Sequence, residues 1–356
     1  MIHPWLEPLW TRLTALGERL PHALLITGAP GLGKRDLAEA LAARLLCEAP
    51  DTGGQACGHC TSCQWRQAGT HPDLRRLVPE SEDARNTTDG APETGEAGGG
   101  ESKAKSTQIV IGQVRAAQEA LTLTSHRGGR RALIVDPAEA MNPFTANALL
   151  KLLEEPPDAC TLILVSSMPR KLLPTIRSRC QQWHAPHPSA EALRHWQAEQ
   201  GEAPRVSASL LALCGGMPLA ARRLAAQGIE TLAERFANDL AEGEIDPLRL
   251  AGQWEAWIKK DKTALAAGFG LPMLVDWMQR WVSDLAALRL GGRVKYFPAR
   301  AERLAALSTR MSAAAAGNCY NEFVNIRRVA NHPLNPRLFL EDMLMRYART
   351  LKGVRP

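Results

Sequence analysis

The sequence predicts an α/β nucleotide-binding fold that is followed by an all-α region. One strand–helix–strand unit lies between Arg131 and Cys180, and a glycine-rich turn follows another apolar strand near the N-terminus. After Cys180 the strand signals end, and the chain becomes rich in alanine, leucine and arginine. These observations indicate a first domain built on a parallel sheet, with helical domains after it.

The strand–helix–strand unit is the centre of this prediction. Ala132–Val135 and Thr161–Val165 are short, apolar and β-branched, as expected of strands that are buried on both faces of a parallel sheet. Thr145–Glu155 has helical spacing, and Pro156 with Pro157 ends that helix. A basic loop follows, which carries Arg170, Lys171, Arg177 and Arg179.

Length and composition fit a globular protein of two or three domains. The chain has 356 residues, of which 45% are apolar and 22% charged. No apolar run approaches the roughly 20 residues that span a bilayer, and the N-terminus lacks the features of a signal peptide, so we expect a cytoplasmic protein. The net charge of +6 permits contact with nucleic acid or an acidic partner and requires neither.

The N-terminal part of the chain predicts a helix, a strand and a second helix. The first stretch is amphipathic and is expected to pack against the sheet through Trp5, Leu6, Leu9, Trp10, Leu13, Leu16 and Leu20. Ala23–Thr27 is then typical of a buried strand, and Asp36–Leu46 of a helix. Between them, Gly28, Gly33 and Lys34 occupy the three fixed positions of the phosphate-binding loop G-x-x-x-x-G-K-[ST].

The last position of this loop departs from the pattern. In such a loop the backbone N–H groups and the helix N-terminus cradle the phosphates, the lysine reaches the β- and γ-phosphates, and the final hydroxyl ligates Mg²⁺. Here the final residue is Arg35, whose guanidinium cannot coordinate Mg²⁺ and would repel it. We expect a degenerate loop that does not support hydrolysis; the alternative is a site that still binds nucleotide.

Four of the eight cysteines are clustered. Cys47, Cys57, Cys60 and Cys63 have the spacing C-x9-C-x2-C-x2-C, and in a reducing compartment such clustering favours a metal over disulfides. Four thiolates suit tetrahedral Zn²⁺, which would be a structural ion here. His59 lies between two better-placed sulfurs and is left out of the ligand set. The alternative is four free, buried cysteines.

Residues 80–106 have a different composition from the rest. They are rich in Gly, Glu, Thr and Ser and contain no aromatic or large aliphatic residue. We interpret them as a disordered surface loop, a tolerated insertion rather than a functional acidic tether. A helix is expected to resume order over Ile109–Thr124.

Asp136 stands at the end of a predicted strand, where an acid would orient Mg²⁺. A hydrolytic site of this type next needs a glutamate that polarises the attacking water. The next residue is Pro137, which has no side-chain base, and Glu139 is expected to face elsewhere on a turn. Two separate requirements for hydrolysis are therefore missing.

The C-terminal half predicts helices only. Ser189 is expected to cap the helix Ala190–Gln200, two short helices follow over Ser207–Leu213 and Leu219–Ala226, and five or six amphipathic helices extend from Glu230 to the end. Tryptophans at helical spacing favour a helical core over a base-stacking surface: Trp254, Trp257, Trp277 and Trp281. We expect domains at residues 1–184, 185–228 and 229–356.

Taken together, four motifs resemble one family. H-A-L-L-I-T-G-A-P-G-L-G-K, the four-cysteine module, N-A-L-L-K-L-L-E-E-P-P and I-R-S-R-C occur together in bacterial clamp-loader subunits, which are AAA+ proteins. The resemblance covers the chain apart from the acidic insert, and it rests on the combination. It implies a RecA-like AAA+ domain, a helical lid and a helical collar that oligomerises.

The resemblance also implies roles for residues. Ser178, Arg179 and Cys180 match the family's serine–arginine–cysteine motif, in which the arginine reaches a neighbouring subunit's ATP. The alternative is that Arg177 and Arg179 are solvated charges. Leu219 stands where ATP-hydrolysing relatives carry a nucleotide-sensing arginine. With Arg35 and Pro137, this favours a subunit without ATPase activity over a gamma/tau-like motor.

The partners that the resemblance implies are the gamma/tau and delta subunits of a hetero-pentamer, and through it the sliding clamp and primed DNA. It leaves open whether ATP or ADP occupies the loop at Gly28, Gly33 and Lys34. Two other functions compete with this one. A gamma/tau-like ATPase is disfavoured by the three lost groups, and a zinc-containing nucleic-acid scaffold leaves the arginine motif unexplained.

Overall fold

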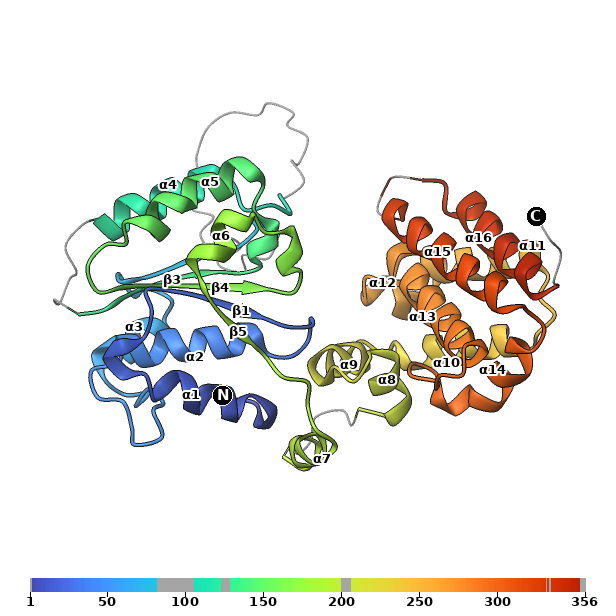
Figure 1. The fold of residues 1–356 in the computed structure, drawn as a ribbon, viewed down its shortest axis with the longest axis horizontal. Coiled ribbons are helices and arrows are strands. Elements are labelled where there is room, and N and C mark those ends of the chain that lie inside the picture. Colours follow the sequence, from blue (N-terminus) through green and yellow to red (C-terminus); the bar gives the residue numbers. More distant parts are fainter. Residues whose placement is uncertain are drawn as a thin grey trace. The chain divides into compact units, whose positions relative to one another are not determined.

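A computed structural model of the chain describes residues 2–81, 106–122, 129–199, 206–330, 332 and 334–352. The predicted insert at 80–106 lies almost entirely outside the described residues. Residue contacts group the chain into two compact units, Met1–Trp196 and Gln197–Pro356 (Figure 1). The three-domain division remains a prediction.

The first unit is built on five parallel strands in the order β2-β3-β4-β1-β5. The three central strands are buried along their whole length, which explains their continuous apolar sequences. Helices α1, α2 and α3 cover one face of the sheet, and α4, α5 and α6 cover the other (Figure 1). The strands are β1 Ala23–Thr27, β2 Leu74–Leu77, β3 Arg131–Val135, β4 Cys160–Ser166 and β5 Gln181–His184.

Five helices of this unit match the sequence prediction in place, whereas α3 and α6 were not predicted. The helices are α1 Glu7–Thr14, α2 Lys34–Leu46, α3 Thr61–Gln67, α4 Ile111–Thr122, α5 Pro143–Glu154 and α6 Pro174–Arg179, with α7 Ala190–Ala198 at the end of the unit. The single N-terminal helix was wrong in extent, because the short 3-10 turns Pro4–Leu6 and Gly17–Arg19 flank α1. Gly17 has φ +53°, a conformation that favours glycine and ends the helical run.

The strand β2 was not predicted, and β5 and α6 correct the sequence prediction. We expected no strand after Cys180, yet β5 follows it directly and pairs with β1 in parallel. Its pattern escaped detection because it is an edge strand in which only Trp183 is buried. The expected basic loop contains α6, which Pro174 begins at its first position. Arg179 is therefore the last residue of a helix.

One part of the core of this unit lies between the sheet and the helices α4 and α5. Leu149, Leu152 and Leu153 of α5 are buried together with Val114 and Leu121 of α4. The sheet contributes Leu133, Val135, Leu162 and Leu164 to the same cluster. Ile176 of α6 belongs to the same cluster. The helices α5 and α6 therefore pack on the same face of the sheet, and this packing places their ends.

The described residues of the second unit form helices and the loops between them, without a β-strand. Its helices are α8 Ala208–Leu213, α9 Pro218–Ala226, α10 Glu230–Ala241, α11 Pro247–Lys260, α12 Lys262–Ala266, α13 Leu271–Arg289, α14 Ala301–Ser308, α15 Ala313–Val329 and α16 Pro336–Leu351. Seven described helices thus follow residue 229, against five or six expected. The additional breaks are N-caps: the side chain of Asp261 accepts an N–H at the start of α12, and that of Ser312 does so at the start of α15.

Three of the four tryptophans that were predicted to form the core of the second unit do so, whereas Trp257 is only partly buried. Trp254, Trp277 and Trp281 are at most 1% exposed. The ring of Phe236 lies 5.1 Å from that of Trp254 and 5.6 Å from that of Trp277. Trp281 donates its indole N–H to the hydroxyl of Tyr347 at 2.8 Å, which satisfies its only donor in a buried place.

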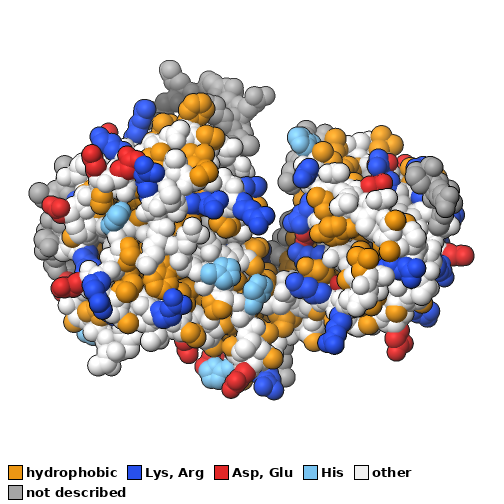
Figure 2. Space-filling model, in the orientation of Figure 1, with side chains coloured by type: hydrophobic (Ala, Val, Ile, Leu, Met, Phe, Trp, Pro, Cys, Tyr) orange, Lys and Arg blue, Asp and Glu red, His pale blue; other side chains and the backbone are white. Residues whose placement is uncertain are grey.

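The surface is mixed in character. Lysine and arginine side chains are distributed over both units in the view of Figure 2, among acidic and apolar ones. Among the helices that the structure describes, none combines the length and apolarity needed to cross a bilayer.

Candidate functional site: a phosphate-binding loop, an exposed arginine and a cysteine cluster

The loop between β1 and α2 has the strand–loop–helix geometry that its sequence predicted. Gly33 caps α2 with φ +80°, and Gly28 has φ +148°. A Cβ at Gly28 would lie 3.1 Å from the Cβ of Ala185 and 3.2 Å from a methyl carbon of Leu32. Glycine is required at this position for both reasons, so the backbone of a phosphate-binding loop is retained.

Lys34 is held by the chain's own oxygen atoms. Its Nζ donates to the carbonyl of Ala29 at 2.7 Å and to the hydroxyl of Ser167 at 2.8 Å. The residue is 5% exposed. This burial lowers the pKa of Lys34, and the charges of Glu139 and Asp136 oppose that shift. The amine that would meet the phosphates is thus already engaged.

Arg35 contacts the acid that would orient the metal. Its Nε donates to Oδ2 of Asp136, directly after β3. Asp136 is 6% exposed, whereas half of the Arg35 side chain is exposed. A guanidinium therefore pairs with this carboxylate, and the two residues that the sequence analysis singled out separately lie together.

Glu139 does not face away from this site, which corrects the sequence expectation. Its Oε1 accepts the backbone N–H of Ser167 at 2.9 Å, and its charge acts on Lys34. Lys34, Ser167 and Glu139 thus form one connected group. The clue was available in the sequence, because Glu139 and Ser167 follow neighbouring parallel strands, whose carboxyl ends meet at one edge of the sheet.

The N-terminal segment packs on the loop from the other side. Trp5 donates its indole N–H to the carbonyl of Leu32 at 2.9 Å. His3 stacks on Trp5 with ring centroids 5.0 Å apart, and its Nε2 lies 2.8 Å from Oδ2 of Asp36 in the first turn of α2. The sequence analysis did not single out His3, since a lone histidine near a terminus carries no pattern.

The serine–arginine–cysteine motif divides between surface and core. Ser178 and Arg179 are exposed at the end of α6. Arg179 Nη1 donates to the carbonyl of Thr175 at 3.1 Å, and Nη2 lies 2.6 Å from Oε1 of Glu154. Cys180 is 7% exposed within the core, and burial raises its pKa to about 12. Ser178 and Arg179 are therefore accessible from outside the chain, and Arg179 is the charged one of the two.

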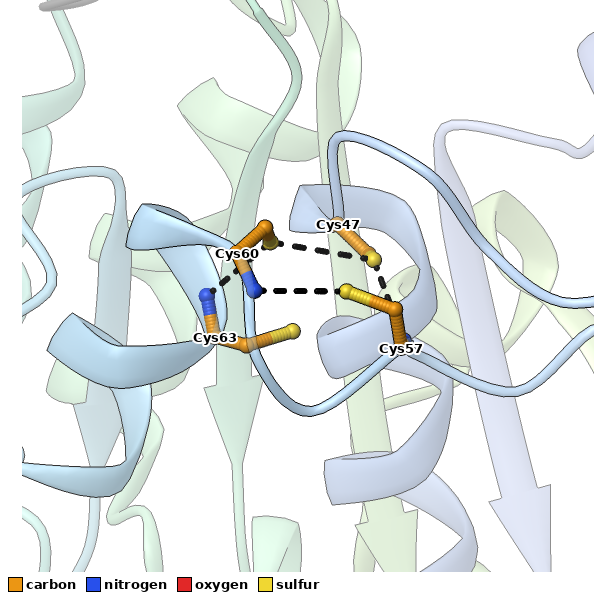
Figure 3. Close-up of side chains that lie close together, drawn as sticks. All are labelled: Cys47, Cys57, Cys60 and Cys63. Atoms are coloured by element: carbon orange, nitrogen blue, oxygen red, sulfur yellow. Dashed lines mark hydrogen bonds between the residues drawn. The ribbon is translucent and has the colours of Figure 1, made fainter.

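The four clustered cysteines come together as predicted (Figure 3). Their Sγ atoms all lie within 4.8 Å of one another. Those of Cys47 and Cys60 are 4.0 Å apart, close to the roughly 3.8 Å between two sulfurs of a tetrahedral Zn–S₄ site with 2.3 Å bonds. Cys47 follows α2, and Cys60 and Cys63 lie at the start of α3.

Backbone N–H groups also point at the sulfurs. The amides of Cys57, Cys60 and Cys63 donate to the sulfurs of Cys47, Cys57 and Cys60, at 3.3 to 3.4 Å. Hydrogen bonds from the amides of His59 and Cys60 lower the pKa of Cys57 to about 7, whereas burial raises that of Cys63 to about 12. The donor set fits Zn²⁺, which favours four thiolates over four mutually close thiols.

The cysteine cluster is tied to the sheet by a buried polar chain. The hydroxyl of Ser62 donates to the carbonyl of Leu46 at 2.5 Å and lies 2.8 Å from Nε2 of His71. Nδ1 of His71 accepts the N–H of Asp73 at 3.1 Å. This chain links the end of α2 to the start of β2. His59 is exposed, and its ring contacts the carbonyl of Cys57 instead of the sulfur group.

A P-loop on a five-stranded parallel sheet, an arginine at the end of α6 and a following helical unit agree with the architecture that the sequence analysis expected of a clamp-loader subunit. Residues 10–188 match the family described as "DNA polymerase III, delta subunit". The chain belongs to the delta' subunit family of the DNA polymerase III clamp loader, a family of DNA replication proteins.

Relatives agree with this assignment. The chain is 37% identical to DNA polymerase III subunit delta' of Pseudomonas aeruginosa over 81% of its own length and 78% of that protein. It is 35% identical to subunit delta' of Escherichia coli, over 68% of the chain and 67% of the relative. It is also 32% identical to subunit tau of Escherichia coli, over 51% of the chain and 25% of that longer protein.

Proposed function

We propose that this chain is the non-hydrolysing delta' subunit of a DNA polymerase III clamp loader, acting as a stator in the bacterial cytoplasm. It would stand beside gamma/tau and delta subunits in a hetero-pentamer that places the sliding clamp on primed DNA. Its own loop stays silent, and Arg179 completes the ATP site of the adjacent subunit. The similarity to both delta' and tau supports this arrangement.

The pairing of Arg35 with Asp136 is the observation that carries the silent site. A metal-bound nucleotide needs that carboxylate and a loop hydroxyl, and a cation is already in contact with the carboxylate. Lys34 would have to leave Ala29 and Ser167 before it could meet a phosphate. Pro137, next to Asp136, supplies no base for water.

The geometry of Arg179 supports the role in trans. Catalysis of phosphoryl transfer is mostly positioning and charge stabilisation, and an arginine from a neighbour supplies positive charge where the γ-phosphate gains negative charge. Arg179 ends a short helix that Ile176 anchors in the core. The buried Ile176 thus holds the helix in place, and the partly exposed guanidinium of Arg179 is accessible to a neighbouring subunit.

Zinc is proposed to be structural. Cys47, Cys57, Cys60 and Cys63 supply all four ligands of a tetrahedral ion, so no position remains open for a substrate. The ion would hold the segment between α2 and β2 in place, where little apolar surface is buried.

The silent site is tested by the ATPase activity of the purified chain. With Mg²⁺ and ATP we expect no hydrolysis above the blank, because the metal position and the base are both lost. Purified gamma/tau subunit serves as the active reference in the same assay. ATP hydrolysis above the blank, in the same fractions as the purified chain, would contradict the proposal of a non-hydrolysing site and favour a gamma/tau-like motor.

A further inference from the structure

We propose that Glu154 is a positioning residue, which holds the guanidinium of Arg179 ready for the ATP of the adjacent subunit. This inference rests on the proposed function of Arg179 in trans. It adds a second residue, Glu154, to that function. The sequence around Glu154 indicates only the end of a helix and does not suggest such a role.

Glu154 and Arg179 are the last residues of two neighbouring helices, α5 and α6, on one face of the sheet (Figure 1). Oε1 of Glu154 lies 2.6 Å from Nη2 of Arg179. The other terminal nitrogen, Nη1, donates to the carbonyl of Thr175 at 3.1 Å. One acceptor from each helix therefore fixes the guanidinium from two directions.

This arrangement leaves the arginine able to act. A guanidinium has five N–H donors, of which the two contacts use two, so three stay available for phosphate oxygens. The side chains of Arg179 and Glu154 are 37% and 48% exposed. Water therefore screens the charge of the Glu154 carboxylate, and the guanidinium of Arg179 keeps its attraction for a γ-phosphate. A long side chain that is already held loses less conformational freedom when it enters the neighbouring site.

The position of Glu154 follows from where α5 ends. Glu155 leaves helical geometry with φ −127° and ψ 70°, and Pro156 cannot continue the helix. Glu154 is thereby fixed at the helix end, beside α6. Glu155 is exposed, and among the described residues its side chain has no hydrogen bond or ion pair. It provides a control with the same charge, one residue away.

The experiment uses the complex reconstituted with gamma/tau and delta subunits, with primed DNA and sliding clamp present. The difference in ATPase kcat between the wild type and Arg179→Ala defines the Arg179-dependent turnover. We expect Glu154→Gln to lower this quantity about two- to fivefold, the size that one half-exposed ion pair can supply. KM for ATP should not change, Glu154→Asp should recover part of the loss, and Glu155→Gln should match the wild type.

A double variant separates positioning from a general structural role. In the Arg179→Ala background, Glu154→Gln should have no further effect, because there is no guanidinium left to hold. A further loss there, or Arg179-dependent turnover that Glu154→Gln leaves unchanged or raises, would overturn the inference while the role of Arg179 stands. If Arg179→Ala itself removes no turnover, the proposed function fails first, and the inference with it.

Discussion

At the scale of single residues, the site is defined by what each side chain already contacts. Arg35 is bonded to Asp136, and Lys34 is bonded to Ala29 and Ser167. The sequence could predict the loss of the loop hydroxyl and of the base, because both are substitutions at fixed motif positions. The order of the strands could have placed Glu139 near Ser167, but the hydrogen bond between them depends on the direction of a side chain on a short turn, which tertiary packing sets.

The same distinction applies to Glu154. Its neighbour Pro156 predicts the end of a helix, but only the packing of α5 beside α6 brings its carboxylate to Arg179. Cys180 shows the opposite case. It belongs to the motif by sequence, and the structure buries it in the core.

The buried thiols give a prediction in pH. Burial raises the pKa of Cys160 to about 11 and that of Cys180 to about 12, above the roughly 8.5 of a free thiol. The pKa values of these thiols are higher in the folded chain than in the unfolded chain. Their contribution to the free energy of unfolding is therefore fully present below about pH 8.5. It is lost as the pH rises through the folded values. We therefore expect the free energy of unfolding to fall between pH 9 and pH 11.

Alkylation followed by mass spectrometry checks the same thiols individually. In the native chain, Cys160 and Cys180 should stay unmodified at both pH 8 and pH 9, because they remain neutral and are shielded from the reagent. In denaturant both should react within minutes. Rapid modification of either thiol in the native state would contradict their assignment to the core.

At the scale of elements, apolar spacing predicted the buried central strands and the longer helices, and it missed a short edge strand and a short helix. The central strands and α2, α4 and α5 follow continuous or 3.6-residue apolar patterns, so their sequences define them. β5 carries only Trp183 inward, and α6 is too short for a periodic signal, so only pairing with β1 and packing on α5 reveal them. The cysteine module was predictable because chelation restricts ligand spacing.

Metal analysis tests the cysteine module. The purified chain should contain about one zinc per molecule, and Cys57→Ser or Cys60→Ser should lose it. Cys214→Ala, which changes a buried cysteine of the second unit, should keep the full content. Because protons compete with the ion for the thiolates, zinc should be released as the pH falls. A zinc-free wild-type chain would rule out this metal at the cluster.

At the scale of the whole molecule, we propose that the chain combines a phosphate-binding loop without hydrolytic activity and an arginine that acts on a neighbouring subunit. The frame of a nucleotide-hydrolysing protein is retained, with the P-loop at β1 and the acid after β3. Inside that frame the chain's own cations contact the acid and the loop carbonyl. Arg179, by contrast, is exposed at a helix end. The proposed arrangement is therefore asymmetric: the ATP site that Arg179 would complete belongs to the adjacent subunit.

The DNA-stimulated ATPase of the reconstituted complex tests that asymmetry most directly. With Arg179→Ala, we expect the complex to assemble normally on size exclusion and kcat to fall. The ATP site that Arg179 completes should be almost inactive, since removing such an arginine lowers kcat at one site on the order of 10³-fold. Arg194→Ala, an exposed arginine of α7, should keep the wild-type rate. A kcat that Arg179→Ala leaves at the wild-type value would contradict the account.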